Sequence, residues 1–286
     1  MEETNNSIIP FTLFTSVRSY SHKLNTEAFS LLTTSKTNIF VDQVEEKSFI
    51  LGCTNDRIPC ETVEQFAPIA HLCFSNFIMA LNIAALGHFT WNLEIFPNIL
   101  YRFIDPNNNE DKIIALKIPR VREIDIRDIT TNDVRRIFLL YEALCKEDNP
   151  NVGREYLKGI LHLSFDFFDI CFYKESFGNF YRSFEDFSLR IRGGKKLTNE
   201  LKDLQKVMKG LGFGADIANE FEQLYILRGD QIMHAQKKQL EVEIDAVLKM
   251  KTVLDAVLHK FYQPVWERGM KDLEASGGTD ADAKES

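Results

Sequence analysis

The sequence predicts an α+β fold that is predominantly helical. A mixed N-terminal domain is expected over residues 1–131, followed by an antiparallel helical bundle within residues 132–270. Short β-branched and aromatic runs separated by polar turns fill residues 7–52, which is typical of strands. After Thr131, apolar residues recur at helical spacing. The last segment, residues 271–286, is rich in Ala, Gly, Asp and Glu and has no periodicity, so we expect a disordered acidic tail.

The N-terminal domain is expected to surround one long helix with strands. That helix covers residues 62–87, where Pro68 is tolerable only near a start or a kink. The run Asp105-Pro-Asn-Asn-Asn-Glu predicts a turn. Strands are expected at residues 8–17, 29–33, 37–41, 48–51, 88–96 and 112–118.

The C-terminal part is expected to contain helices only. Thr131-Asn-Asp133 can cap the first of them, and Gly193-Gly194 predicts a loop in the middle of the set. Helices are expected at residues 131–146, 153–173, 176–191, 197–209, 216–234 and 242–262. The helices after residue 153 would form the bundle.

Composition limits the kind of partner. The chain has 286 residues, 44% hydrophobic and 27% charged, and its 23 Phe can supply a sizeable core. The net charge of −8 and a pI near 5.4 argue against a protein that coats nucleic acid through bulk charge. A local basic groove stays compatible with these values.

Cysteine usage and the N-terminus predict a cytoplasmic protein. The five cysteines are scattered and form no Cys-x-x-Cys pair, which favours reduced thiols, and no ligand spacing suggests a metal or a cofactor. The acidic N-terminus lacks the basic and apolar regions of a signal peptide. The most apolar run, residues 71–87, is short and contains Ser75, Asn76 and Asn82, so we interpret it as a buried helix with no membrane contact.

One helix carries a conspicuous pair of side chains. On the predicted helix over residues 216–234, Arg228 falls within an apolar stripe, where a buried guanidinium requires a partner. His234 lies on the flank of that stripe, about 120° round and roughly 9 Å further along the axis. A guanidinium and an imidazole at the rim of a packing face can act together on a phosphate.

The string Arg228-Gly-Asp-Gln-Ile-Met-His234, preceded by Tyr225-Ile-Leu, resembles the motif of the HEPN superfamily, in particular its ApeA-like branch. The segment around Glu185 resembles an earlier bundle helix that bears an acidic residue, and the resemblance covers residues 153–262. Two features depart from the family. Gly229 stands where a polar residue is usual, with Asp230 one position later, and five residues separate Arg from His where four is commonest.

The resemblance implies metal-independent cleavage of RNA at a homodimer interface. Arg228 would bind the phosphate and His234 would act as general acid or base, because an imidazole titrates near neutrality and a guanidinium matches phosphate geometry. Asp230, Tyr225 and Glu185 would support them. RNases of this family serve in antiviral defence or toxin systems. By analogy, the expected partners are RNA, with tRNA one candidate, and a protein or phage-derived trigger.

Basic residues near the motif are candidates for tracking an RNA backbone. They are Arg190, Arg192, Lys195, Lys196, Lys237 and Lys238. The alternative is a solvated charged face balanced by acidic neighbours. Likewise, Arg228 could pair structurally with Glu222 or Glu185, and His234 could be an ordinary histidine at a helix end. Two other functions therefore stay open: a catalytically silent HEPN module that binds RNA, a nucleotide or a protein partner, and a structural helical interaction protein.

Overall fold

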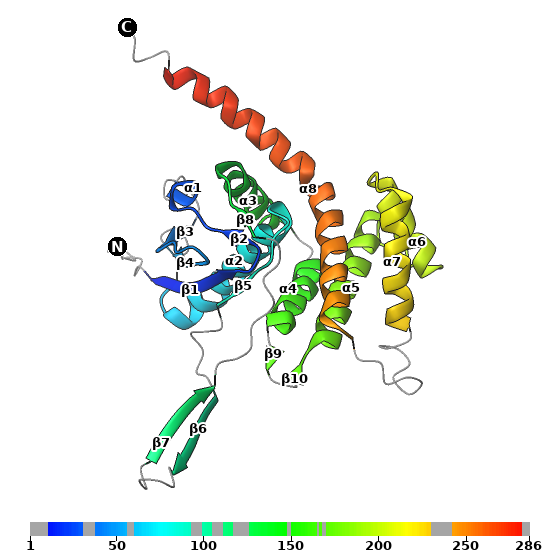
Figure 1. Ribbon diagram of the computed structural model, residues 1–286. Coiled ribbons are helices and arrows are strands. Elements are labelled where there is room, and N and C mark those ends of the chain that lie inside the picture. The colour runs from blue at the N-terminus through cyan, green and yellow to red at the C-terminus, as the bar shows by residue number, and fades with distance from the viewer. Residues whose placement is uncertain are drawn as a thin grey trace, which may run out of the picture.

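The protein is an α+β molecule dominated by helices, as predicted (Figure 1). The structure is a computed structural model, and its helices and strands carry the labels of Figure 1. The residues that it describes are 11–30, 38–55, 60–92, 99–104, 111–116, 126–147, 150–164, 166–167, 170–229 and 242–281.

A four-stranded antiparallel sheet forms the N-terminal part, in the order β3-β4-β1-β5. Its strands are β1 (Thr12–Ser19), β3 (Ile39–Asp42), β4 (Ser48–Thr54) and β5 (Phe89–Trp91). The central pair places Thr15 opposite Leu51. The strands predicted at residues 8–17, 37–41, 48–51 and 88–96 are thus confirmed within the described residues.

Two further strand pairs lie outside this sheet. β6 (Ile99–Ile104) and β7 (Asp111–Leu116) form a hairpin that projects from the body, which agrees with the strand predicted at residues 112–118 (Figure 1). β2 (His22–Lys23) pairs in parallel with β8 (Arg127–Asp128). The strand predicted at residues 29–33 is wrong at residues 29 and 30, which are helical. There the Asn25 side chain accepts a hydrogen bond from the backbone of Glu27 at 2.9 Å and caps the short helix α1 (Thr26–Ser30).

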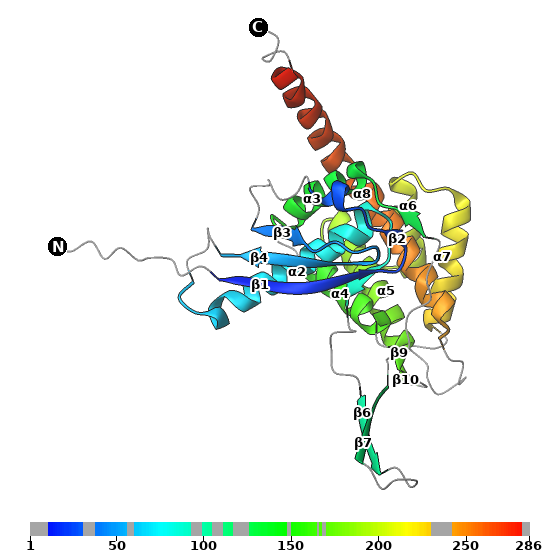
Figure 2. The ribbon, with the colours of Figure 1, turned by 60° about the vertical axis from the view of Figure 1, so that its left-hand side comes forward.

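Helix α2 (Val63–Ala84) lies against this sheet and is largely buried (Figure 2). It begins at Thr62, whose side chain accepts from the backbone N–H of Gln65, and it contains Pro68 in its second turn. By length and composition it is the one described helix apolar enough to cross a membrane. Most of that apolar stretch is buried by other parts of the protein, which confirms the interpretation of a buried helix.

The remaining helices follow the predicted order. They are α3 (Thr131–Leu144), α4 (Pro150–Ser164), α5 (Tyr173–Ile191), α6 (Glu200–Gly210), α7 (Ala215–Arg228) and α8 (Ile244–Ala281). Thr130, one residue before the predicted cap, exchanges hydrogen bonds with Asp133 at the start of α3. α4 packs along α5, and α8 packs against α2, α3, α5 and α7.

Two predicted helices have the wrong length. The helix expected over residues 153–173 ends at Ser164, and the strands β9 (Asp166–Phe167) and β10 (Ile170–Cys171) follow, because this aromatic-rich stretch suits a tight strand pair. The last helix was expected to end at Tyr262, with a disordered tail over residues 271–286. Instead α8 continues to Ala281 and includes Pro264, since a helix nucleated by a buried segment propagates cheaply.

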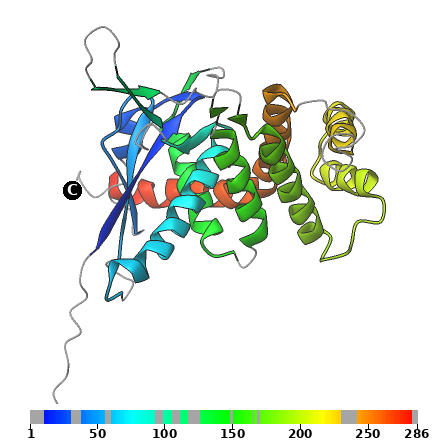
Figure 3. The same cartoon turned by 90° about the horizontal axis from the view of Figure 1, so that it is seen from below.

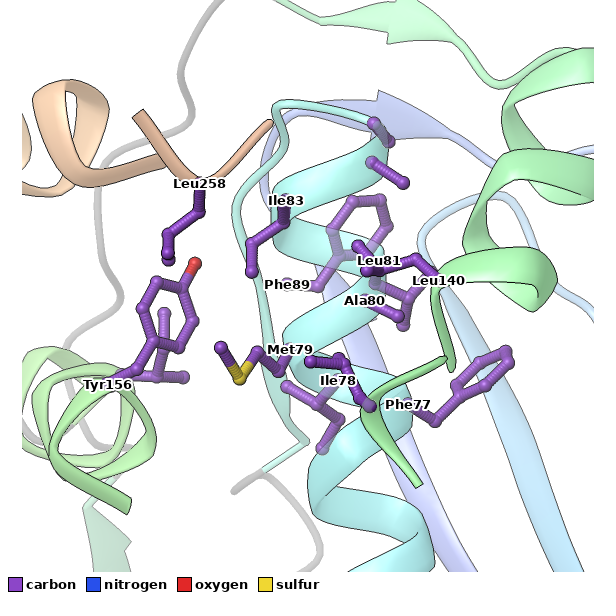
Figure 4. Close-up of a cluster of buried hydrophobic side chains, with 14 of the residues drawn as sticks. Phe77, Ile78, Met79, Ala80, Leu81, Ile83, Phe89, Leu140, Tyr156 and Leu258 are labelled. Atoms are coloured by element: carbon purple, nitrogen blue, oxygen red, sulfur yellow. The ribbon is translucent and has the colours of Figure 1, made fainter. Parts of the chain in front are cut away.

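The core is continuous across residue 131. Buried side chains of the sheet, of α2 and of the later helices belong to one hydrophobic cluster. Figure 4 shows Tyr156 of α4 and Leu258 of α8 facing Met79 and Ile83 of α2. The helices that carry the candidate site are therefore anchored to the same core as the sheet.

Candidate functional site

Three helices bring four polar side chains together at the edge of the helical part. Tyr181 and Glu185 lie one turn apart on α5, Glu200 is the first residue of α6, and Arg228 is the last residue of α7. Residues four apart on a helix share a face, so α5 presents its phenol and carboxylate in the same direction. We call Tyr181, Glu185, Glu200 and Arg228 the arginine cluster.

The guanidinium of Arg228 is held from three sides. Its Nη1 donates to Oε1 of Glu200 at 2.5 Å, and its Nη2 donates to Oε1 of Glu185 at 3.0 Å. The guanidinium carbon lies 4.3 Å from the centre of the Tyr181 ring, within the range of a cation–π contact. The Tyr181 hydroxyl donates to the same Glu200 oxygen at 2.8 Å, which closes the cluster.

The cluster is partly withdrawn from water. The side chains of Arg228, Glu185 and Glu200 are 18%, 20% and 26% exposed. An arginine in an apolar stripe was expected to need compensation, and two carboxylates supply it. From the sequence, Glu222 and Glu185 were possible structural partners of Arg228. Glu185 is such a partner, and the second partner, Glu200, was not predicted.

The two carboxylates differ in proton affinity. Burial, followed by the hydrogen bond with Glu200, raises the pKa of Glu185 from 4.5 to about 7, although the charge of Arg228 opposes this change. Burial also acts against ionisation of Glu200. The hydrogen bonds of Tyr181, Glu185 and Arg228 outweigh it and hold the pKa of Glu200 below its ordinary value. Glu185 is thus the group of the cluster that takes up a proton near neutral pH.

The other motif residues are described only in part. Tyr225 lies one turn before Arg228 on α7 and packs, half-buried, against the core. The described helix ends at Arg228, with Gly229 as its C-cap. Asp230, His234, Lys237 and Lys238 lie outside the described residues.

The predicted RNA-tracking residues fall into two groups. Arg190 donates to both carboxylate oxygens of Glu147, at 2.7 Å and 3.0 Å, and Arg192 lies 2.9 Å from a carboxylate oxygen of Asp203. Their charges are already matched within the protein. Lys195 and Lys196, in the loop after α5, are exposed.

Glu200 and Tyr181 are the cluster residues that sequence reasoning missed. An acidic residue in the first turn of a helix is common because it opposes the helix dipole, so Glu200 gave no distinct signal. For Tyr181 the one available signal was its position four residues before Glu185, which places both side chains on the same face of a helix. No family model, curated protein or solved structure matches this chain.

Proposed function

We propose that the protein is a metal-independent endoribonuclease of HEPN type, with Arg228 and His234 as its catalytic residues and RNA as its substrate. The observation that supports this most directly is the arginine cluster. It holds the motif arginine at the end of α7 beside a carboxylate whose pKa is about 7. An antiviral or toxin role follows from the family resemblance alone.

The proposed reaction uses the 2′-hydroxyl of RNA. That oxygen bonds to the adjacent phosphorus, its proton passes to a base, the bond from phosphorus to the 5′-oxygen breaks, and the departing oxygen takes up a proton. His234 would transfer one of these protons. Arg228 would stabilise the negative charge that builds up on the phosphate oxygens. The products are a 2′,3′-cyclic phosphate and a free 5′-hydroxyl.

Glu185 would control access to Arg228. While Glu185 is ionised it occupies Nη2 of Arg228, whereas its neutral form accepts that hydrogen bond more weakly. Because the pKa of Glu185 is about 7, proton uptake would release Nη2 for a phosphate oxygen around neutral pH. We therefore expect RNA affinity to rise as pH falls from about 8 to about 6.

A homodimer would place two such sites together. α7 lies at the outer edge of the molecule, and its Ile226 side chain is 47% exposed (Figure 1). A twofold axis beside α7 would bury this side chain against its copy. Sedimentation velocity at micromolar concentration should show a dimer that Ile226→Asp dissociates, while a wild-type monomer would contradict the proposal.

The decisive experiment is RNA cleavage in EDTA. His234→Ala and Arg228→Ala should each slow cleavage about 100-fold or more, and the double variant should lose little more, because the two groups act on one step. Arg228→Lys should also be poor, since an ammonium cannot replace the bidentate fork. His162→Ala and Arg268→Lys serve as matched controls and should cleave at the wild-type rate. Wild-type cleavage by His234→Ala, or loss of activity in EDTA, would show that this pair is not the catalytic one.

A catalytically silent HEPN module is the second candidate. It is favoured by the two carboxylates that already neutralise Arg228, which leave few guanidinium donors for a phosphate. In that case purified protein would bind RNA with an affinity that falls with added salt, yet it would leave the RNA intact.

A further inference from the structure

A second candidate site lies on the other side of the molecule from α7. A cavity of about 1060 Å³ opens between the sheet, α2, α4 and the end of α3, and Figure 3 shows α2 lying between the strands and α4. We call it the α2 groove. Its apolar lining includes Phe14, Leu72, Trp91, Leu144, Leu157 and Leu161.

The groove is long, apolar and open. Pro68, Leu72, Ser75 and Met79 line it from α2, a stretch of roughly 16 Å along the helix axis. Large apolar side chains within it are accessible, because Leu72 is 59% and Phe14 56% exposed. An accessible apolar surface that is also concave is typical of a ligand site.

One wall of the groove carries basic and apolar side chains in two neighbouring rows. Arg154, Leu157, Lys158 and Leu161 line it from α4 at spacings of three and four residues, so they share one helix face. Arg154 and Lys158 form the basic row, and Leu157 and Leu161, each three residues further along, form the apolar row beside it. Such a wall can contact an anionic head through the basic row and an apolar chain through the apolar row.

The charged groups around the basic row leave an excess of one positive charge. Glu155 is nearly buried and lies 2.8 Å from Nζ of Lys158 and 3.5 Å from guanidinium nitrogens of both Arg154 and Arg182. Asp186 is the second carboxylate that interacts with this group. Three cations thus face two carboxylates, and one monovalent anion would neutralise them. Glu147, at another part of the lining, is already paired with Arg190 and Tyr262.

We propose that the α2 groove binds a single-chain fatty acid. Its carboxylate lies at Arg154 and Lys158, and its chain follows α2 past Leu72 and Phe14. The Lys158 side chain is 48% exposed, so its ammonium can contact the ligand while Glu155 stays paired with the arginines. The excess of one charge favours a carboxylate over a dianionic phosphate head. This site is independent of the proposed ribonuclease activity.

The groove contains its own spectroscopic probe. Trp91 lines it and stacks against His71 with ring centres 6.3 Å apart, and the chain has one other tryptophan, Trp266. In Trp266→Phe, tryptophan fluorescence therefore reports on Trp91 alone. Titration below the micelle concentration with dodecanoate should give a saturable change and an affinity at least 10-fold higher than that of dodecanol. Calorimetry on the unaltered chain measures the same affinities without a variant.

Substitutions separate the head site from the chain site. R154Q/K158Q should weaken dodecanoate binding at least 10-fold and leave dodecanol binding unchanged. Leu72→Glu, at an exposed position, should weaken both ligands. K260Q/K271Q removes two exposed lysines of α8 and should change neither.

Several outcomes would overturn the proposal. They are an absence of saturable binding, equal affinity of R154Q/K158Q and wild type for dodecanoate, and tighter binding of dodecyl phosphate than of dodecanoate. Because these titrations contain no RNA, a failure here leaves the ribonuclease proposal standing, and the reverse also holds.

Discussion

The raised pKa of Glu185 gives the protein a pH-dependent stability that one substitution should remove. A carboxyl group whose pKa is raised by folding stabilises the folded state fully below its ordinary pKa. That contribution is lost as pH rises through the folded-state value. For Glu185 this window runs from 4.5 to about 7.

The size of the effect follows from the same values. A tenfold change in proton affinity corresponds to about 1.4 kcal/mol, so Glu185 alone would change the free energy of unfolding by about 3 kcal/mol across the window. The lowered pKa of Glu200 acts in the opposite direction, because its contribution is lost as pH falls. Glu185 is also 20% exposed, so solvent screens part of its interaction. We expect a net loss of about 2 kcal/mol between pH of about 5 and about 8.

Glu185→Gln is the test, since an amide does not titrate and still accepts a hydrogen bond from Arg228. Urea unfolding followed by circular dichroism at several pH values should show that the free energy of unfolding of wild type falls by about 2 kcal/mol as pH rises, whereas that of the variant shows no such loss. Glu175→Gln, an exposed glutamate of the same helix, should keep the wild-type dependence. The reasoning would be refuted if the free energy of unfolding changed with pH in the same way for wild type and Glu185→Gln.

Two further predictions concern packing and buried charge. Gly159→Ala should destabilise the protein by about 2 kcal/mol, because a Cβ there would lie 2.6 Å from ring atoms of Phe180, whereas Gly210→Ala meets nothing within 4 Å and should be nearly neutral in the same urea experiment. Lys251→Met should cost about 3 kcal/mol, because it leaves the buried carboxylate of Asp255 without its cation. Adding Asp255→Asn should restore part of that stability in thermal unfolding, and a double variant as unstable as the single one would contradict this explanation.

The sequence by itself determined the class of fold and most of its elements. Runs of β-branched and aromatic residues placed three strands of the sheet, and alternation placed the fourth, β5. Helical spacing placed α2 and the helices from α3 onwards, because local side-chain patterns dictate which face is buried. Thr62 and Asn199 then fix where α2 and α6 begin through hydrogen bonds to nearby backbone. The same patterns failed at residues 166–167 and 170–171, where an aromatic-rich sequence that suits a helix core also suits a strand pair.

The sequence also showed that Arg228 needs a partner, but only the tertiary structure decided which. Its partners come from two other helices, 43 and 28 residues away along the chain, and nothing in local spacing brings Glu185 and Glu200 to one guanidinium. The α2 groove was likewise decided only by the tertiary structure, since its walls come from the sheet, α2 and α4. Hydrophobic periodicity selects a buried face within each element. The packing of several elements around one core then decides which polar side chains meet.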